Sequence, residues 1–306
     1  MASRVSFASA LAVLLVWSPL FAAPGVGDLW TDDFEAAKAR AKEQGKDLLI
    51  DFTGSDWCGW CFRLRDEVFV KPRFIAEAPK GFVLVELDYP QRKKLKPEIV
   101  ERNAKLKAQF HVSGYPTIAL ADADGRVYAK TGYQQGGEDR YLDHLAELRK
   151  IKSWRDNALA EAQKLSGIDK AKSLDAIITR LGNARVVPMD NPDWVAQILQ
   201  LDADGKAGLK AKYEILQQLD VAERLMGEGQ FAQAIASVNK TIVDLKPTGD
   251  ALQEACYVKG MCQHRSGDAK GAIASFETGL KASPNGPKSR HLTQYIQVLG
   301  KSKGRD

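Results

Sequence analysis

Cys58 and Cys61 have the most distinctive chemistry in this chain, and only two residues separate them. The segment before them, residues 47–53 (DLLIDFT), is an apolar run that favours a buried strand. The segment after them, residues 62–68, has the apolar spacing of a helix. A cysteine at a strand-to-helix junction lies beside free backbone N–H groups and the positive end of the helix dipole, which favour a thiolate. The pattern therefore predicts a reversible disulfide.

Two cysteines at this spacing can also be inert structural thiols or half of a zinc site, which needs two further ligands. The other cysteines, Cys256 and Cys262, begin 195 residues beyond Cys61, and the four histidines form no cluster. We therefore expect redox chemistry with no metal and no cofactor. Cys256 and Cys262 are six residues apart on one expected helix and point to different faces, so we interpret them as small core residues.

The composition is that of a soluble globular protein long enough for two domains, with 306 residues, 44% hydrophobic and 27% charged. The net charge of +5 comes partly from one basic run, residues 92–96 (RKKLK). We interpret this run as part of a solvated loop, because no broader basic face with interleaved aromatic residues accompanies it. No nucleic-acid partner is expected.

The first 23 residues have the pattern of a secretory signal peptide. Arg4 is followed by an apolar core at residues 7–17, and then by a helix break and small residues suited to cleavage after Ala22 or Ala23. The apolar core is too short for a comfortable membrane span. We therefore expect an exported protein, periplasmic or extracellular, in a compartment where disulfides persist.

Helical and strand patterns alternate around the cysteine pair. Helices are expected at residues 32–44, 62–68, 98–110 and 137–150, with a short helical turn at 74–78, and strands at 47–53, 82–88, 117–121 and 127–130. This order implies a central mixed sheet flanked by helices, with the cysteines at the carboxyl end of a central strand, where open α/β sheets place their sites. Asp56, Arg63 and the loop at residues 90–97 are expected to be solvated.

Residues 29–151 resemble the thioredoxin superfamily in three features. These are Asp51-Phe52 before WCGWC (residues 57–61), GYPT (residues 114–117) before a strand and hairpin, and Gly132-Tyr133 after the hairpin. The variant is similar to secreted bacterial thioredoxin-like domains with the motif DFTGSxWCxWC. The resemblance implies an α/β thioredoxin-like fold for residues 24–151 and the activity of a protein-disulfide oxidoreductase.

The resemblance also implies a role for each site residue. Cys58 would be the exposed nucleophile and Cys61 the buried resolving thiol. Asp51 would be a buried acid that accepts the proton of Cys61, because burial raises the pKa of a carboxyl group. Pro116 would follow a cis peptide bond, and Tyr115 would offer main-chain hydrogen bonds to the substrate.

Three residues are expected to form the immediate environment of the cysteines. Gly59 and Trp60 make the turn between them, Trp60 being exposed to substrate, and Trp57 is expected to pack beside the site. The chain departs from ordinary thioredoxin in two respects. One extra residue lies between the strand acid and the first cysteine, and the dipeptide is Gly-Trp rather than Gly-Pro. Since this dipeptide tunes the redox poise, the direction of electron flow stays open.

The second half, residues 152–306, is expected to be all-helical. Residues 230–238 parallel residues 268–276 at an offset of 38, and this internal repeat resembles tetratricopeptide repeats over about residues 212–299. Such helix pairs stack into a surface that binds a peptide or a partner protein. A helical extension that only packs on the first domain is the alternative. Residues 202–205 (DADG) are interpreted as a turn rather than a calcium loop.

Two functions from different classes remain. The first is an exported thiol–disulfide oxidoreductase that acts on protein or peptide disulfides through Cys58 and Cys61, supplied by a membrane-bound electron donor. The second is a binding or assembly protein that uses the thioredoxin-like domain as a scaffold and the helical repeats for partner recognition. A peroxidase is a weaker hypothesis, because the chain shows no peroxidatic loop.

Overall fold

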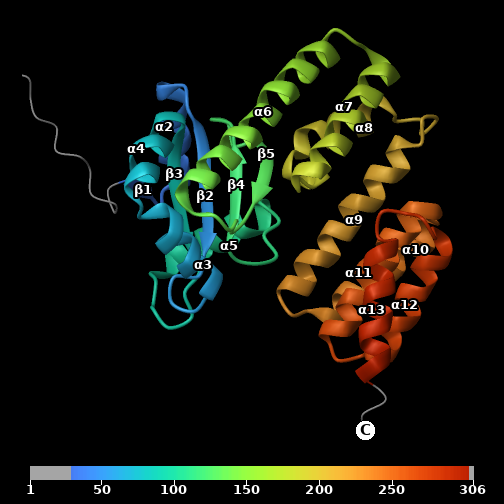
Figure 1. Cartoon of the computed structure of the whole chain (residues 1–306). Coiled ribbons are helices and arrows are strands. Elements are labelled where there is room, and N and C mark those ends of the chain that lie inside the picture. The colour runs from blue at the N-terminus through green and yellow to red at the C-terminus, as the bar shows by residue number, and fades with distance from the viewer. Residues whose placement is uncertain (1–28, 303–306) are drawn as a thin grey trace, which may run out of the picture.

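A five-stranded sheet forms the centre of the first half of the molecule (Figure 1), in the computed structural model that describes residues 29–302. The strand order is β1-β3-β2-β4-β5. The strands are β1 (Trp30–Thr31), β2 (Asp47–Thr53), β3 (Phe82–Asp88), β4 (Thr117–Ala121) and β5 (Val127–Thr131). Strands β1, β3 and β2 run parallel, whereas β4 is antiparallel to β2 and to β5. This confirms the predicted mixed sheet, with β2 central and buried along its whole length.

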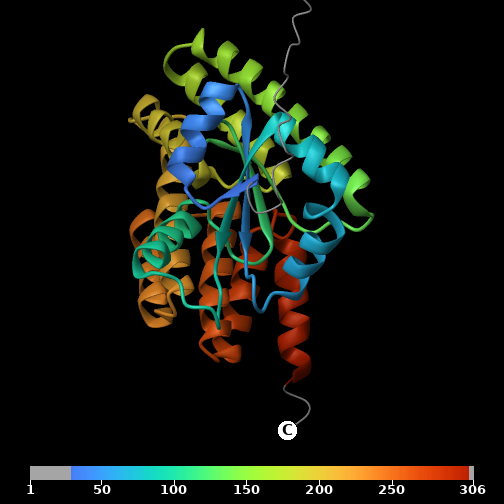
Figure 2. The same ribbon diagram turned by 90° about the vertical axis from the view of Figure 1, so that its left-hand side faces the viewer.

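Helices cover both faces of this sheet. They are α2 (Phe34–Gln44), α3 (Gly59–Leu64) with its π-helical continuation η1 (Arg65–Phe69), α4 (Pro72–Gly81), α5 (Pro97–Gln109) and α6 (Gly137–Gln163). Figure 2 shows α2 and α5 on one side of the sheet and α3, α4 and α6 on the other. Asp33 caps the N-terminus of α2, where its carboxylate accepts the N–H of Ala36 at 3.0 Å, and Gly45 caps the C-terminus in the left-handed conformation (φ 63°).

Two expectations for this half were wrong. No strand was expected before residue 47, but β1 lies before α2. Its two residues pair with Leu84 and Val85 of β3 and are too few to leave a periodic pattern in the sequence. The short turn expected at residues 74–78 is the ten-residue helix α4. This helix starts with Pro72 at its first turn, where a proline needs no N–H partner, and continues past Pro79.

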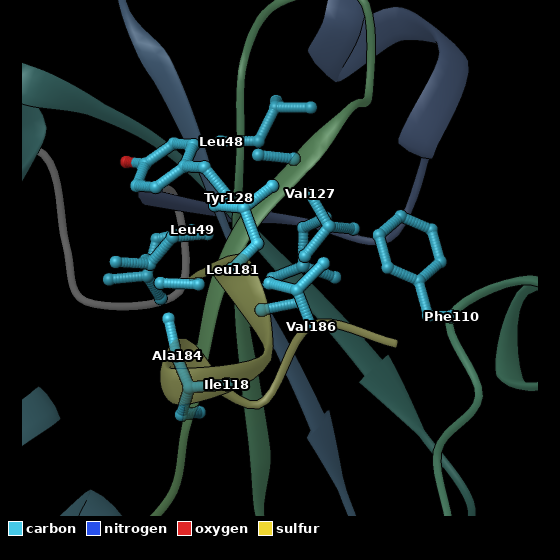
Figure 3. Packing of buried hydrophobic residues seen from close by; sticks show 14 of the residues in the cluster. Leu48, Leu49, Phe110, Ile118, Val127, Tyr128, Leu181, Ala184 and Val186 are labelled. Atoms are coloured by element: carbon cyan, nitrogen blue, oxygen red, sulfur yellow. The ribbon is translucent and has the colours of Figure 1, made fainter. Parts of the chain in front are cut away.

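The second half is helical, as predicted, and its first part packs onto the sheet. It begins with α7 (Gly167–Leu181), η2 (Gly182–Ala184), η3 (Pro188–Asp190) and α8 (Pro192–Leu201). Leu181, Ala184 and Val186 lie against the sheet residues Ile118 and Val127 in one continuous core (Figure 3). The predicted domain boundary after residue 151 falls inside the continuous helix α6.

Five further helices follow in a stack: α9 (Leu209–Gly227), α10 (Phe231–Leu245), α11 (Gly249–Arg265), α12 (Ala269–Ala282) and α13 (Ser289–Ser302). The two copies of the sequence repeat form the beginnings of α10 and α12, each the second helix of a hairpin. The DADG segment is a turn after α8, where Asp202 accepts the N–H groups of Ala207 and Lys210. The assignment to tetratricopeptide repeats stays a prediction.

We expect Gly260→Ala to destabilise this helical stack. A Cβ atom at Gly260 of α11 would lie 2.3 Å from the ring of Phe276 on α12, so the buried ring would have to move. Overpacking of this kind costs about 1–3 kcal/mol, measurable as a lower urea midpoint. The matched control is Gly227→Ala at the end of α9, where the added carbon meets no described atom within 4 Å apart from its chain neighbours and its own helix backbone. An equal midpoint for both variants would contradict the packing argument.

Candidate active site

Cys58 and Cys61 form a disulfide at the N-terminus of α3, with a Cα–Cα distance of 5.2 Å. Cys58 is the N-cap residue of this helix, and its Sγ accepts the N–H of Cys61 at 3.2 Å. A thiolate at this sulfur would be stabilised by that N–H group and by the helix dipole. Because β2 ends five residues earlier, the pair lies at the carboxyl end of the central strand.

The structure does not meet the expectation that Cys58 is exposed. Both Cys58 and Cys61 are only 5% exposed in the disulfide form. The reason is that the Cys58 sulfur is turned toward the first turn of α3 and bonded to Cys61. Trp57 and Trp60, at 37% and 55% exposure, present the surface next to the disulfide instead.

Trp60 is exposed, as expected, and its ring is part of a cluster with Tyr133 and Arg63. Its ring lies 5.3 Å from that of Tyr133, and the guanidinium of Arg63 lies over both rings at 5.3 and 5.2 Å. Glu67 fixes the arrangement by pairing with Arg63 at 3.2 Å and accepting the hydroxyl of Tyr133 at 2.5 Å. The expectation that Arg63 is only solvated was therefore wrong.

On the other side of the disulfide, the Tyr115–Pro116 peptide bond is cis. The ring of Tyr115 packs edge-on against Trp57 with 5.5 Å between ring centroids, which agrees with the expected packing role of Trp57. Close packing explains why the residue after the hairpin, Gly132, is a glycine. A Cβ atom there would lie 3.0 Å from the carbonyl oxygen of Pro116. The loop containing Pro116 is thus held close to the cysteine pair through Trp57.

Asp56, also expected to be only solvated, anchors the neighbouring basic loop. Its carboxylate accepts the backbone N–H groups of Gln91, Arg92 and Lys93 at 2.9, 2.7 and 2.7 Å. These donors hold the pKa of Asp56 below its ordinary value. Because Asp56 lies two residues before Cys58, these hydrogen bonds fix the loop between β3 and α5 beside the site.

Asp51 lies on β2 and is 5% exposed, with its Oδ1 atom buried and without a hydrogen-bond partner among the described residues. A cavity of about 390 Å³ is lined by both Asp51 and Cys61, so the extra residue in the loop does not separate the carboxyl group from the resolving cysteine. Burial raises the pKa of Asp51 well above its ordinary value, and the neighbouring Glu86 and Asp88 add to the increase.

Sequence reasoning missed three charged residues of this cavity, Asp32 before α2, Glu86 on β3 and Arg65 on η1. The signal for Glu86 was its carboxylate inside the otherwise apolar run FVLVEL (residues 82–87). Its position opposite Asp51 depends on strand register, which the local pattern does not contain.

Between residues 29 and 302 no group of three or more His, Cys, Asp or Glu side chains could hold a metal ion, and no helix is long and apolar enough to cross a membrane. Cys256 and Cys262 are buried, unpaired cysteines of α11. Burial raises the pKa of both thiols, to about 11 for Cys262. They are far less reactive than a thiol at a helix N-terminus.

Comparison with known proteins agrees with this geometry. The thioredoxin-like protein family matches residues 29–123. The disulfide bond reductase DsbH of Chlamydia pneumoniae is 31% identical over 125 residues, which cover 41% of this chain and 75% of that protein. The thiol:disulfide interchange protein DsbD of Vibrio cholerae is 33% identical over 118 residues, but the match covers only 18% of its length and 38% of this chain. An uncharacterized protein of Treponema pallidum is 22% identical over 76% of this chain and 78% of its own length.

Proposed function

The chain belongs to the thioredoxin superfamily and is a protein-disulfide oxidoreductase, and on that premise we propose that it reduces disulfides of exported proteins by cycling Cys58 and Cys61 between dithiol and disulfide. The observation that carries the proposal is the Cys58–Cys61 disulfide at the N-terminus of α3. The direction is supported by DsbH, which is described as a disulfide bond reductase.

The proposed cycle begins with the thiolate of Cys58, which attacks one sulfur of a substrate disulfide. One substrate thiolate leaves, and a mixed disulfide joins Cys58 to the other half. Cys61 then attacks the Cys58 sulfur, passes its proton to Asp51 and releases the second substrate thiol. Two electrons move from the cysteine pair to the substrate, and the pair ends as the disulfide.

Renewed activity requires an electron donor, and we propose that it is membrane-bound and lies outside the cytoplasm with the exported protein. The support for export is the signal-peptide pattern of residues 1–23, which lie outside the described residues. The stacked helices α9–α13 would bind a client or the redox partner, since such stacks form extended binding surfaces.

The direct test is reduction of the insulin disulfides by the mature chain with dithiothreitol as donor. We expect catalysis above the reductant alone, with oxidised Cys58–Cys61 accumulating when the donor is withheld. If the chain instead oxidises a reduced protein faster than it reduces an oxidised one, the proposed direction is wrong.

We expect Asp51→Asn to slow the cycle and to stabilise the fold. Loss of the proton acceptor should slow the Cys61 step by about 10²-fold. Removing a buried charge without a partner should raise the free energy of unfolding by about 1–3 kcal/mol at pH 8. Because the folded-state pKa of Asp51 is raised, its destabilising effect exists only above the unfolded value, and the gain should vanish as the pH falls below about 4. Urea midpoints at the two pH values check this, and a loss of stability at pH 8 would contradict it.

A further inference from the structure

Besides Asp51, two further carboxyl groups that the cycle above does not use line the cavity beside Cys61, Asp32 and Glu86. Asp32 is paired with the guanidinium of Arg102 at 3.0 Å, which leaves Glu86 as the candidate. We infer that Glu86 transfers protons between Asp51 and the solvent during thiol–disulfide exchange. The inference rests on the proposed function and deepens it. Glu86 acts through Asp51 and is therefore a positioning residue rather than a catalytic one.

Asp51 is almost closed off from the solvent. The residue is only 5% exposed, and its buried Oδ1 atom has no hydrogen-bond partner within the described part of the chain. A proton taken from Cys61 must leave before the next turnover, because a protonated Asp51 cannot accept another. The cavity is the open space that Asp51 and Cys61 share.

Glu86 lies on the strand next to Asp51 and reaches the solvent. In the parallel pairing of β2 with β3, Asp51 lies directly opposite Glu86, and residues paired in this way project from the same face of a sheet. Glu86 lines the same cavity as Asp51, yet it is exposed to solvent, whereas its strand neighbours Val85 and Leu87 are buried. Its carboxyl group thus connects the interior of the cavity with the outside.

The cavity is large enough to hold water molecules that carry a proton between the two carboxyl groups. Its volume of about 390 Å³ exceeds the roughly 30 Å³ that one water occupies in the liquid, and its polar lining residues, which include Thr53 and Ser55, can hold water in it. Proton transfer from Asp51 to Glu86 then needs no movement of the backbone.

The charges around the two carboxyl groups suit a relay. Partial desolvation of the carboxyl group at the cavity and the neighbouring carboxylate of Asp88 raise the pKa of Glu86, which the cations Lys93 and Arg65 oppose. Asp51 faces the carboxylates of Glu86 and Asp88. Tyr141 of α6 also faces Asp51 and keeps its own proton, because burial raises its pKa. Both carboxyl groups of the relay therefore hold protons more readily than free carboxylic acids do.

The proton balance is simple. When Cys61 attacks the mixed disulfide, the S–H bond of Cys61 breaks and its proton moves to Asp51, while the Cys58–Cys61 bond forms and the substrate thiolate leaves. The proton then passes from Asp51 through Glu86 to the solvent, where the substrate thiolate takes up a proton. The disulfide exchange itself moves the two electrons, so the relay needs no other reactant.

The test uses the reduced mature chain, mixed with the aromatic disulfide dithiobis(nitrobenzoate) in a stopped-flow instrument at a series of pH values. The first release of the coloured thiolate reports attack by Cys58 and tests the proposed function. The second release is first-order in protein and reports resolution by Cys61. Because the relay clears Asp51 between turnovers, for Glu86→Gln we expect unchanged plateau rates for both phases of this single turnover. The steady-state rate of insulin reduction with dithiothreitol should instead fall about 10- to 100-fold at its high-pH plateau, below the roughly 10²- to 10⁴-fold contribution of a directly transferring group.

Asp88→Asn is the matched control, because Asp88 also raises the pKa of Asp51 but does not line the cavity. Both variants should move the pH midpoint of the second phase downward, since each removes a negative charge near Asp51. Only Glu86→Gln should lower the steady-state plateau and recover it as imidazole is added, and Glu86→Asp should retain most of the wild-type rate. An unchanged steady-state plateau without buffer dependence, or the same loss in Asp88→Asn, would overturn the relay. Absence of the first phase in the wild type would instead overturn the proposed function.

Discussion

Cys58→Ser is expected to abolish disulfide reduction, lowering the turnover of insulin reduction by about 10⁴-fold or more, the scale seen when a covalent nucleophile is removed. In the fold, the sulfur of Cys58 caps the N-terminus of α3 by accepting the N–H of Cys61 at 3.2 Å. A serine hydroxyl can replace this hydrogen bond but not the thiolate, so the fold should survive while the chemistry is lost.

Cys61→Ser should have a different outcome, because Cys58 can still attack. We expect this variant to accumulate a mixed disulfide with its substrate, visible as a covalent complex on a non-reducing gel. Cys256→Ala is the matched control, since this unpaired cysteine is buried in α11. If Cys58→Ser retained all partner binding and the wild type showed no redox activity, the scaffold hypothesis would replace the oxidoreductase.

His111→Ala is expected to give the largest loss of stability, because His111 joins the two halves of the molecule. It follows α5, and its Nδ1 and Nε2 atoms lie 3.0 Å from Asp190 of η3 and 2.8 Å from Asp220 of α9. Lys130 of β5 also contacts Asp190, at 2.6 Å. Removing the imidazole leaves two partly or fully buried carboxylates with fewer cations, which should cost about 2–4 kcal/mol at pH 6.

The loss should depend on pH. Burial of the ring opposes protonation, but Asp190 and Asp220 outweigh it and raise the pKa of His111 from 6.5 to about 9. Because the folded value lies above the unfolded one, the stabilisation is full below about pH 6.5 and is lost as the pH rises through about 9. This pKa difference between the folded and unfolded states corresponds to a stabilisation of roughly 3 kcal/mol, which solvent screening reduces.

Urea midpoints of the wild type and His111→Ala at pH 6 and pH 10 measure this effect. We expect a large difference at pH 6 and a small one at pH 10. His264→Ala is the control, because His264 is exposed on α11. An equal difference at both pH values would mean that His111 contributes packing rather than charge.

Much of the first domain was predictable because its signals are local. The apolar run of β2, the cysteine pair after it and the alternation of β3, β4 and β5 with helices follow from the order of residues in single segments. The cis bond before Pro116 agrees with the resemblance to thioredoxins. These features depend on neighbours in the sequence or on a motif.

The features that the sequence did not reveal depend on contacts between distant segments. Strand β1 exists through its pairing with β3, and Glu86 meets Asp51 only through strand register. Asp56 finds its donors 35 to 37 residues away. The packing of α7 and η2 on the sheet joins the helical half to the first domain, although composition alone suggested a boundary near residue 151.

The reduction potential of the Cys58–Cys61 pair tests the central claim most directly. The mature chain would be equilibrated in dithiothreitol or glutathione redox buffers. The readout is tryptophan fluorescence, since Trp57 precedes Cys58 and Trp60 lies between the two cysteines. A disulfide reductase should show one reversible two-electron transition near about −270 mV, the value of thioredoxin. A transition between about −120 and −180 mV would indicate an oxidase or isomerase, and the absence of any reversible transition would contradict the redox cycle itself.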